Sequence, residues 1–135
     1  MLFDLLWKLA AVLGLMAGVA TSYEGAPDAP LYVDQFFPGQ SLTYGGVAEP
    51  WVAVDWRAYG DWVEPGDVLL VVFEDRPSMR VRALDAGRLA DHYVACWPDL
   101  PILVDVPRWL VPGSHSLASW KVIVVNLSKA NRRER

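Results

Sequence analysis

The stretch Glu64–Phe73, which reads EPGDVLLVVF, is the part of this sequence that indicates the fold most directly. Its last six residues, Val68–Phe73, form a continuous apolar run, which is typical of a strand buried on both faces. The Pro65-Gly66-Asp67 segment before the run is a turn sequence that leads the chain into the strand. We therefore expect a buried β-strand here, and its partners must lie elsewhere in the chain.

Several other short segments also have the composition of β-strands. Met79–Ala83 alternates, with Arg80 and Arg82 on one face and apolar residues on the other. Helical residues are confined to short pieces, one within Gly87–Val94 and one turn after Pro107. The remaining expected strands are Trp51–Asp55, Ile102–Asp105 and Trp120–Asn126. The pattern predicts an all-β barrel or sandwich with one or two short helices.

Two segments do not match this strand pattern. Residues 21–50 are rich in Gly, Pro and small polar residues, so we expect no long helix there. The tail Lys129–Arg135 is basic and polar, and we expect it to be frayed.

The overall composition narrows the class of protein. The 135 residues suit one domain, and 53% hydrophobic with only 21% charged residues excludes a disordered chain. A net charge of −4 argues against a broad nucleic-acid surface. The single Cys96 excludes an internal disulfide, and we expect it to be a buried thiol. His92 and His115 lack metal-ligand spacing, so we expect no metal and no cofactor.

The first twenty residues contain only two charges, Asp4 and Lys8, and end in a twelve-residue apolar run, Leu9–Ala20. That run is too short to cross a bilayer, which needs roughly 20 residues. It suits the core of a signal peptide, with Gly18 and Ala20 as the small residues before a cleavage site. We favour a cleaved signal and export to the cell envelope or beyond. A retained membrane anchor and a buried helix are the alternatives.

Three of the expected strand segments stop on an aspartate. They are Trp51–Asp55, Val81–Asp85 and Ile102–Asp105. Strand ends gather at one rim of a closed sheet, where neighbouring carboxylates raise each other's pKa, as a general acid requires. The alternative is structural: an Asp after a strand hydrogen-bonds backbone amides in the turn, and Asp105 can cap the turn that Pro107 starts.

An ordered set of motifs resembles a known family. The set is a small-residue strand ending in Tyr, Gly18–Tyr23, then WVAVD, EPGD, ALDAG and VD, and it spans roughly residues 18–127. It resembles the three-aspartate domain, a double-psi β-barrel of cell-wall proteins and of membrane-bound lytic transglycosylase A. Rare lipoprotein A-like barrels share the opening strand. The resemblance implies a six-stranded double-psi β-barrel over residues 21–127, whose first strand can start near residue 18. The leader or anchor at 1–20 and the tail at 128–135 would flank it.

The same resemblance implies an activity. It implies lytic-transglycosylase cleavage of peptidoglycan glycan strands, with Asp85 as the catalytic acid and then base. Asp55 and Asp105 would help to shape the site. The segment Asp85-Ala-Gly87 departs from the family's Asp-Thr-Gly-Gly, and the next strand aspartate comes twenty residues later. The alternative is therefore a non-catalytic barrel that binds glycan, or a structural subunit of an envelope or surface assembly, for which the apolar composition would provide partner surfaces.

Aromatic and basic residues supply the candidate binding groups. Sugar rings stack on aromatic side chains, and we expect Trp56 and Trp97 to be exposed for this purpose while the other tryptophans fill the core. Arg88 is a candidate contact for the substrate. The alternative for Arg88 and its neighbours is a solvated edge strand whose charges keep it unpaired; those neighbours are Arg76, Arg80 and Arg82.

Overall fold

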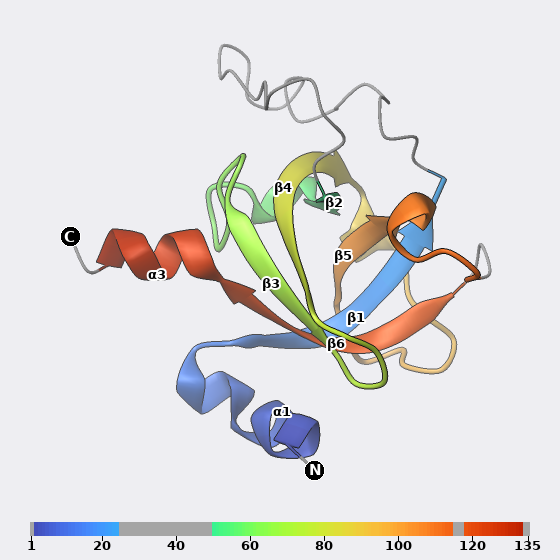
Figure 1. The fold of residues 1–135 in the computed structure, drawn as a ribbon, viewed down its shortest axis with the longest axis horizontal. Coiled ribbons are helices and arrows are strands. Elements are labelled where there is room, and N and C mark those ends of the chain that lie inside the picture. The colour runs from blue at the N-terminus through green and yellow to red at the C-terminus, as the bar shows by residue number, and fades with distance from the viewer. Residues whose placement is uncertain (1, 25–49, 115–117, 134–135) are drawn as a thin grey trace.

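The computed structural model describes residues 2–24, 50–114 and 118–133, and the structure is mainly β (Figure 1). Most of the expected helix-free segment 21–50 lies outside these residues. The strands are β1 (Met16–Tyr23), β2 (Trp51–Asp55), β3 (Val68–Phe73), β4 (Met79–Gly87), β5 (Ile102–Pro107) and β6 (Ser119–Asn126). The helices are α1 (Leu2–Leu13), α3 (Leu127–Arg133) and the 3₁₀ turns η1 (Trp56–Ala58), η2 (Leu89–Asp91) and η3 (Arg108–Leu110).

The six strands form one sheet that closes on itself in the order β1-β5-β2-β4-β3-β6. The last strand completes the ring by pairing antiparallel with β1 on one side and with β3 on the other. The pairs β1–β5 and β2–β4 are parallel, and each contains one register shift. Every strand therefore has a neighbour on both sides.

The pairing pattern has an internal symmetry. Suppose that β1 is exchanged with β4, β2 with β5, and β3 with β6. The order of neighbours around the ring is then the same, read in the opposite direction. The exchange converts the parallel pair β1–β5 into the parallel pair β4–β2, and the antiparallel pair β1–β6 into β4–β3. The strand pairing of the first half of the chain is thus repeated in the second.

The ring has one inward face, and this corrects the expectation for β3. Its residues alternate between buried and half-buried, with Leu69, Val71 and Phe73 in the core. A strand covered on both faces would be buried throughout, whereas a closed sheet buries only the side chains that point inward. The apolar residues between them lie on the outer face, where they are partly exposed.

The strand bounds show where the sequence predictions were too short. β2 and β3 begin and end at the predicted residues. β4 continues to Gly87 and β5 to Pro107, so Asp85 and Asp105 lie inside strands and only Asp55 ends one. The expected edge strand is also wrong, because β4 is paired on both sides. The helix expected within Gly87–Val94 is the single 3₁₀ turn η2.

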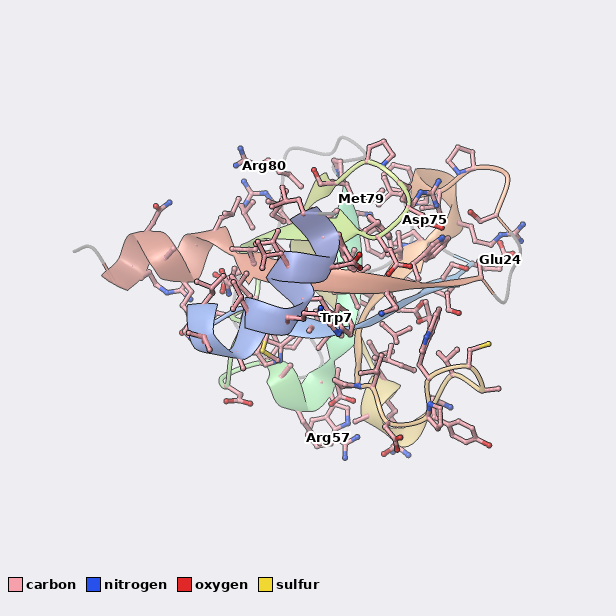
Figure 2. All side chains as sticks on the ribbon, turned by 90° about the horizontal axis from the view of Figure 1, so that it is seen from below. Trp7, Glu24, Arg57, Asp75, Met79 and Arg80 are labelled. Carbon is pink, nitrogen blue, oxygen red and sulfur yellow. The ribbon has the colours of Figure 1, made fainter. Side chains whose placement is uncertain are left out.

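The first twenty residues divide into a helix and a strand. Helix α1 packs beside β1 and β6, and Figure 2 shows it crossing the lower face of the ring with Trp7 directed toward β6. The ammonium group of Lys121 lies 4.5 Å from the Trp7 ring centroid. The boundary expected at residue 20 falls inside β1, where Val19 and Ala20 are fully buried. In the described residues, no helix has the length and apolar character needed to cross a membrane.

Gly18 has a structural reason to be small. A Cβ atom at this position would lie 2.5 Å from the carbonyl oxygen of Pro101 and 2.8 Å from Cγ of Leu103. The close approach accompanies a hydrogen bond from the Val19 amide to the same Pro101 oxygen, 2.9 Å long. The small residue that resembles part of a cleavage site is therefore also required by strand packing.

We predict that Gly18→Ala destabilises the domain by about 1–3 kcal/mol, because the new methyl group collides with backbone that cannot move aside. Gly87→Ala is the matched control in β4, where a Cβ atom would meet only Leu89 at 3.5 Å, an ordinary contact. Urea unfolding of both variants measures the difference. Equal unfolding free energies for the two variants would contradict the steric explanation.

Residues up to 133 form helix α3, which corrects the expectation of a frayed tail for this part; residues 134 and 135 lie outside the described residues. Arg132 in this helix donates from Nη1 and Nη2 to both carboxylate oxygens of Asp67, at 2.7 and 3.1 Å. Asn126 and the backbone N–H of Glu64 also donate to Asp67 Oδ2, at 2.9 and 2.8 Å. Asp67 is only 5% exposed, so the helix is held by a buried carboxylate with four donors.

Cys96 differs from the expectation as well. It is exposed, in the loop between η2 and β5, and it is not the buried thiol that we expected. No residue of this loop, between Leu89 and Ile102, belongs to the buried core.

Candidate functional site

Two of the three predicted aspartates lie in one row across the closed sheet. Ala53 in β2 pairs with Asp85 of β4 on one side and with Asp105 of β5 on the other. Asp105 in turn pairs with Thr21 of β1. Adjacent strands are about 4.8 Å apart, so the Cα atoms of the two aspartates lie roughly 10 Å apart with one small residue between them. Ala53 leaves room for the carboxyl groups to interact above it.

Asp85 is held by hydrogen bonds on both carboxylate oxygens. Oδ2 accepts from the hydroxyl group of Tyr23 at 2.8 Å, and Oδ1 accepts from the backbone N–H of Ala86 at 2.9 Å. The hydroxyl group of Tyr59 donates to the backbone oxygen of Asp85 at 2.7 Å. Asp85 is 3% exposed, and its orientation is therefore fixed from two sides.

Asp105 has a different environment, in which ionisation is disfavoured. Burial raises its pKa to about 6, and the negative charge of Asp85 adds to this effect. A hydrogen bond from the Thr21 hydroxyl group, 3.0 Å long, and the nearby His92 act in the opposite direction. The pair thus contains one carboxyl that is half protonated near pH 6, beside a carboxyl that is held by two donors.

The tyrosines of this cluster are neutral donors. Burial raises the pKa of Tyr23 well above its ordinary value, and the charge of Asp85 raises it further. The pKa of Tyr59 is raised for the same two reasons. Both hydroxyl groups therefore keep their protons over the whole physiological pH range and can donate hydrogen bonds throughout.

Asp55 lies in a separate network. Its Oδ1 accepts from the backbone N–H and from Nε of Arg57, at 2.9 and 3.0 Å, and its Oδ2 accepts from the Ala90 amide at 2.6 Å. Burial opposes ionisation, but these hydrogen bonds outweigh it and lower the pKa. Asp55 therefore caps the η1 turn and ties it to Ala90, which is the structural role that the sequence left open.

The three predicted binding residues, Trp56, Trp97 and Arg88, differ in their exposure. Trp56 is 40% exposed and lies over the guanidinium group of Arg57, at 5.5 Å from ring centroid to Cζ. Trp97 is half-buried, and Arg88 is exposed at the end of β4. One aromatic ring that contacts Tyr23 is Trp51, which is buried and packs edge-on against the tyrosine ring at 6.1 Å between ring centroids.

Sequence reasoning missed three polar residues of the cluster: Thr21, Tyr23 and Tyr59. The first two lie in the small-residue strand that carried the family resemblance, so their place in the chain offered a signal. Tyr59 follows the η1 turn and reaches Asp85 across 26 positions of sequence, and nothing in its local pattern indicates this.

Comparisons with known proteins do not extend this picture: no family model, no curated protein and no solved structure matches the chain. Within residues 2–24, 50–114 and 118–133, no group of three or more His, Cys, Asp or Glu side chains could hold a metal ion. The chemistry of the site therefore has to be argued from the side chains themselves.

The raised pKa of Asp105 predicts a pH-dependent stability. Its folded pKa of about 6 lies above the ordinary value of 3.8, so the charged form destabilises the folded state. At one pKa unit per 1.36 kcal/mol, the cost is at most about 3 kcal/mol above pH 6, and it disappears as the pH falls toward 4. We expect Asp105→Asn to be more stable than the wild type at pH 8 and to lose this advantage at pH 4.

Urea unfolding at five pH values between 4 and 8 measures this prediction. Thr21→Val is the matched variant, because it removes the hydrogen bond that lowers the pKa of Asp105 and should move the transition to higher pH. A difference between the wild type and Asp105→Asn that is the same at pH 4 and pH 8 would show that Asp105 does not titrate in this range.

Proposed function

We propose that the closed sheet is a double-psi β-barrel that cleaves glycan strands of the peptidoglycan type by acid–base catalysis. The symmetric pairing of the two halves supports the fold, because a double-psi barrel is built from two interlocked units of the same topology. The resemblance of the motifs from Gly18 to Asp105 supports the choice of substrate.

The observation that carries the chemical proposal is the Asp85–Asp105 pair. Glycoside cleavage uses two carboxyl groups, one of which donates a proton while the other stabilises the positive centre. Asp105, with its pKa of about 6, is partly protonated near neutral pH. Asp85 is oriented by Tyr23 and Ala86. We therefore assign the role of catalytic acid to Asp105. The motif alone implies Asp85 for this role.

In the proposed reaction, the carboxyl group of Asp105 gives its proton to the glycosidic oxygen as the bond to the sugar breaks. The carboxylate of Asp85 stabilises the oxocarbenium-like centre by its negative charge. The Asp105 carboxylate then takes a proton from the sugar's own hydroxyl group, whose oxygen closes onto the anomeric carbon. The product is an anhydro sugar, and no water is consumed.

We predict that purified sacculi release anhydro-muropeptides with the wild type and that Asp105→Asn reduces the rate at least a hundredfold, because general acid catalysis contributes about 10²–10⁴. The wild-type rate should fall as the pH rises above about 6, where Asp105 loses its proton. The matched control is Asp61→Asn, which changes an exposed aspartate that follows η1 in the chain. This variant should keep the wild-type rate.

A non-catalytic barrel that binds glycan is the second candidate, and one observation favours it. Asp85 is 3% exposed and has both oxygens engaged by donors, which limits its access to a substrate. If the wild type releases no product between pH 4.5 and 8.5 but sediments with sacculi, this second function replaces the first. If it neither cleaves nor sediments, both are excluded.

A peptidoglycan substrate would place the domain outside the cytoplasm, either exported or tethered to the membrane. Cleavage after Ala20 would remove Met16–Ala20, five of the eight residues of β1, from the closed sheet. We therefore propose that residues 16–20 stay in the working domain. Helix α1 would then remain as a possible contact to the membrane or to a protein partner, with Leu2 72% and Val12 84% exposed.

A further inference from the structure

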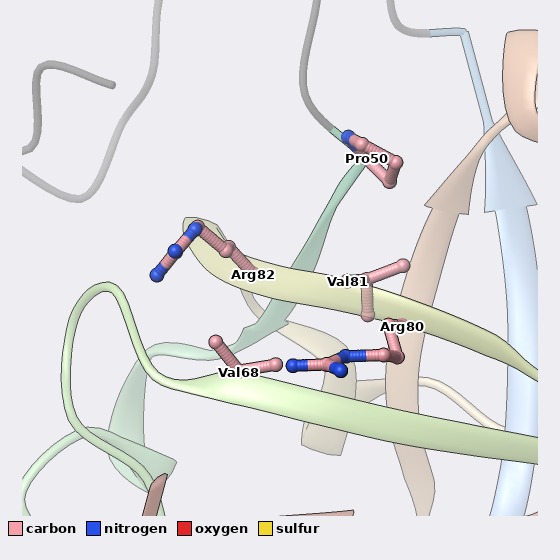
Figure 3. Close-up of a pocket in the computed structure, with 5 residues that line it drawn as sticks. All are labelled: Pro50, Val68, Arg80, Val81 and Arg82. Atoms are coloured by element: carbon pink, nitrogen blue, oxygen red, sulfur yellow. The ribbon is translucent and has the colours of Figure 1, made fainter. Parts of the chain in front are cut away.

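We propose that a cleft on the outer face of the sheet binds an oxyanion, that is, a phosphate or carboxylate group. The cleft lies between Pro50 and strands β3 and β4 and has a volume of about 210 Å³, and neither Asp85 nor Asp105 lines it. It is lined by Pro50, Val68, Arg80, Val81 and Arg82 (Figure 3). The proposal does not depend on the glycan reaction.

The sheet brings the two arginines to the same side of β4. They are two residues apart, and side chains at this spacing lie on one face of a strand, roughly 6.6 Å apart along it. Arg82 pairs with Val68 of β3, and Arg80 pairs with Leu70. Figure 3 shows both side chains extending from β4 in the same direction, with the guanidinium group of Arg80 next to Val68.

The two guanidinium groups have complementary roles in the cleft. Arg82 donates from Nη1 to the backbone oxygen of Gly66 at 3.1 Å, which fixes its orientation before a ligand arrives. Arg80 is exposed, and within the described part of the chain its side chain takes part in no ion pair or hydrogen bond. A planar guanidinium group matches the paired oxygens of a carboxylate or phosphate.

The size and walls of the cleft define the ligand. Pro50 and Val68 provide apolar side chains at the cleft, whereas the side chain of Val81 is buried in the core and only its backbone faces the cleft. A volume of about 210 Å³ is below the 300–1,000 Å³ typical of sites for whole small molecules. The cleft therefore fits one charged group, either a free ion or an acidic substituent of a larger molecule.

The cleft adjoins the residues around the aspartate pair. Arg82 is in register with Trp51 of β2, and Trp51 packs against Tyr23, the residue that donates to Asp85.

The test is a titration of the ¹⁵N-labelled full chain with inorganic phosphate, followed by amide chemical shifts. We expect saturable shifts at Val68, Val81 and their neighbours, and at least tenfold weaker binding in Arg80→Gln. Arg80→Lys should weaken binding less, because it keeps the charge and loses only the paired donors. Lys8→Gln removes the same charge from helix α1 and is the matched control; it should bind as the wild type does.

Each result decides the proposal. Absence of saturable shifts up to about 20 mM phosphate in the wild type, or equal binding by Arg80→Gln, would overturn it. Equal weakening in Lys8→Gln and Arg80→Gln would also overturn it, because it would show a general charge effect. A parallel titration with acetate identifies the source: tighter binding of phosphate indicates a phosphorylated ligand, and tighter binding of acetate indicates a carboxylate. Arg80 is exposed, so we expect its variants to stay folded, and weaker binding then reports the loss of the guanidinium group.

Discussion

Deletion of residues 2–20 will unfold the domain, whereas deletion of residues 2–14 will leave the ring of strands folded. The longer deletion removes Met16–Ala20, which pair with β6 along their length and include the fully buried Val19 and Ala20. Loss of these residues opens the ring between β5 and β6 and exposes the core. The expected effect is as large as the total stability of a small domain, about 5–15 kcal/mol.

The shorter deletion removes α1 and its contacts, which include buried Ala10 and the interaction of Trp7 with Lys121. We expect it to cost about 1–3 kcal/mol, because most apolar residues of α1 are exposed in the folded chain. Circular dichroism and amide spectra of the two deletion variants measure the difference. A folded, cooperative protein after the longer deletion would show that β1 is dispensable, and it would support leader cleavage after Ala20.

Arg132→Ala will destabilise the domain, because it leaves the Asp67 carboxylate, which is 5% exposed, with only the Asn126 and Glu64 donors and no charged partner. Asn131→Ala is the matched control, since it is an exposed residue on the same helix. Asp67→Asn combined with Arg132→Ala should recover part of the loss, because the buried charge is then removed together with its partner. Urea unfolding at pH 7 measures all three.

The same ion pair makes stability depend on acid. Burial opposes ionisation of Asp67, but the hydrogen bonds from Arg132 and Asn126 outweigh it and lower the pKa. This contribution is fully present above the ordinary pKa of 3.8 and is lost as the pH falls through the lower, folded value. Arg132→Ala should therefore lose less stability between pH 5 and pH 2 than the wild type. Identical acid profiles for the two would show that the ion pair does not stabilise the fold.

The strands that could be predicted accurately from the sequence are those with turn or polar residues at their ends. Turn residues precede Val68–Phe73, and polar residues follow Trp51–Asp55, so both strands were predicted to the residue. Asp85 and Asp105 were read as strand terminators, which made β4 and β5 too short. An aspartate can continue a strand when partners such as Thr21 or Tyr23 come from another part of the chain, and no local pattern contains that information.

The candidate site shows the same division. The sequence singled out Asp85 and Asp105, which the ring brings together through Ala53. It also grouped Asp55 with them, because all three follow apolar residues, but Arg57 and Ala90 engage that carboxylate instead. Which side chains converge depends on register across parallel strands, and a shift of one residue in β2–β4 places Asp85 opposite Ala53. Register of this kind is fixed by long-range contacts and cannot be read from spacing.

The position of β1 also has a consequence for the time at which the chain can fold. Its two neighbours are β5 and β6, so Val19 pairs with Ile102 and Lys121. During synthesis, the first strand of the sheet has no partner until β5 or β6 has left the ribosome. Chains dominated by such distant pairings fold slowly, in milliseconds to seconds. The apolar residues of β1 are therefore without their sheet partners while β2, β3 and β4 are being synthesised.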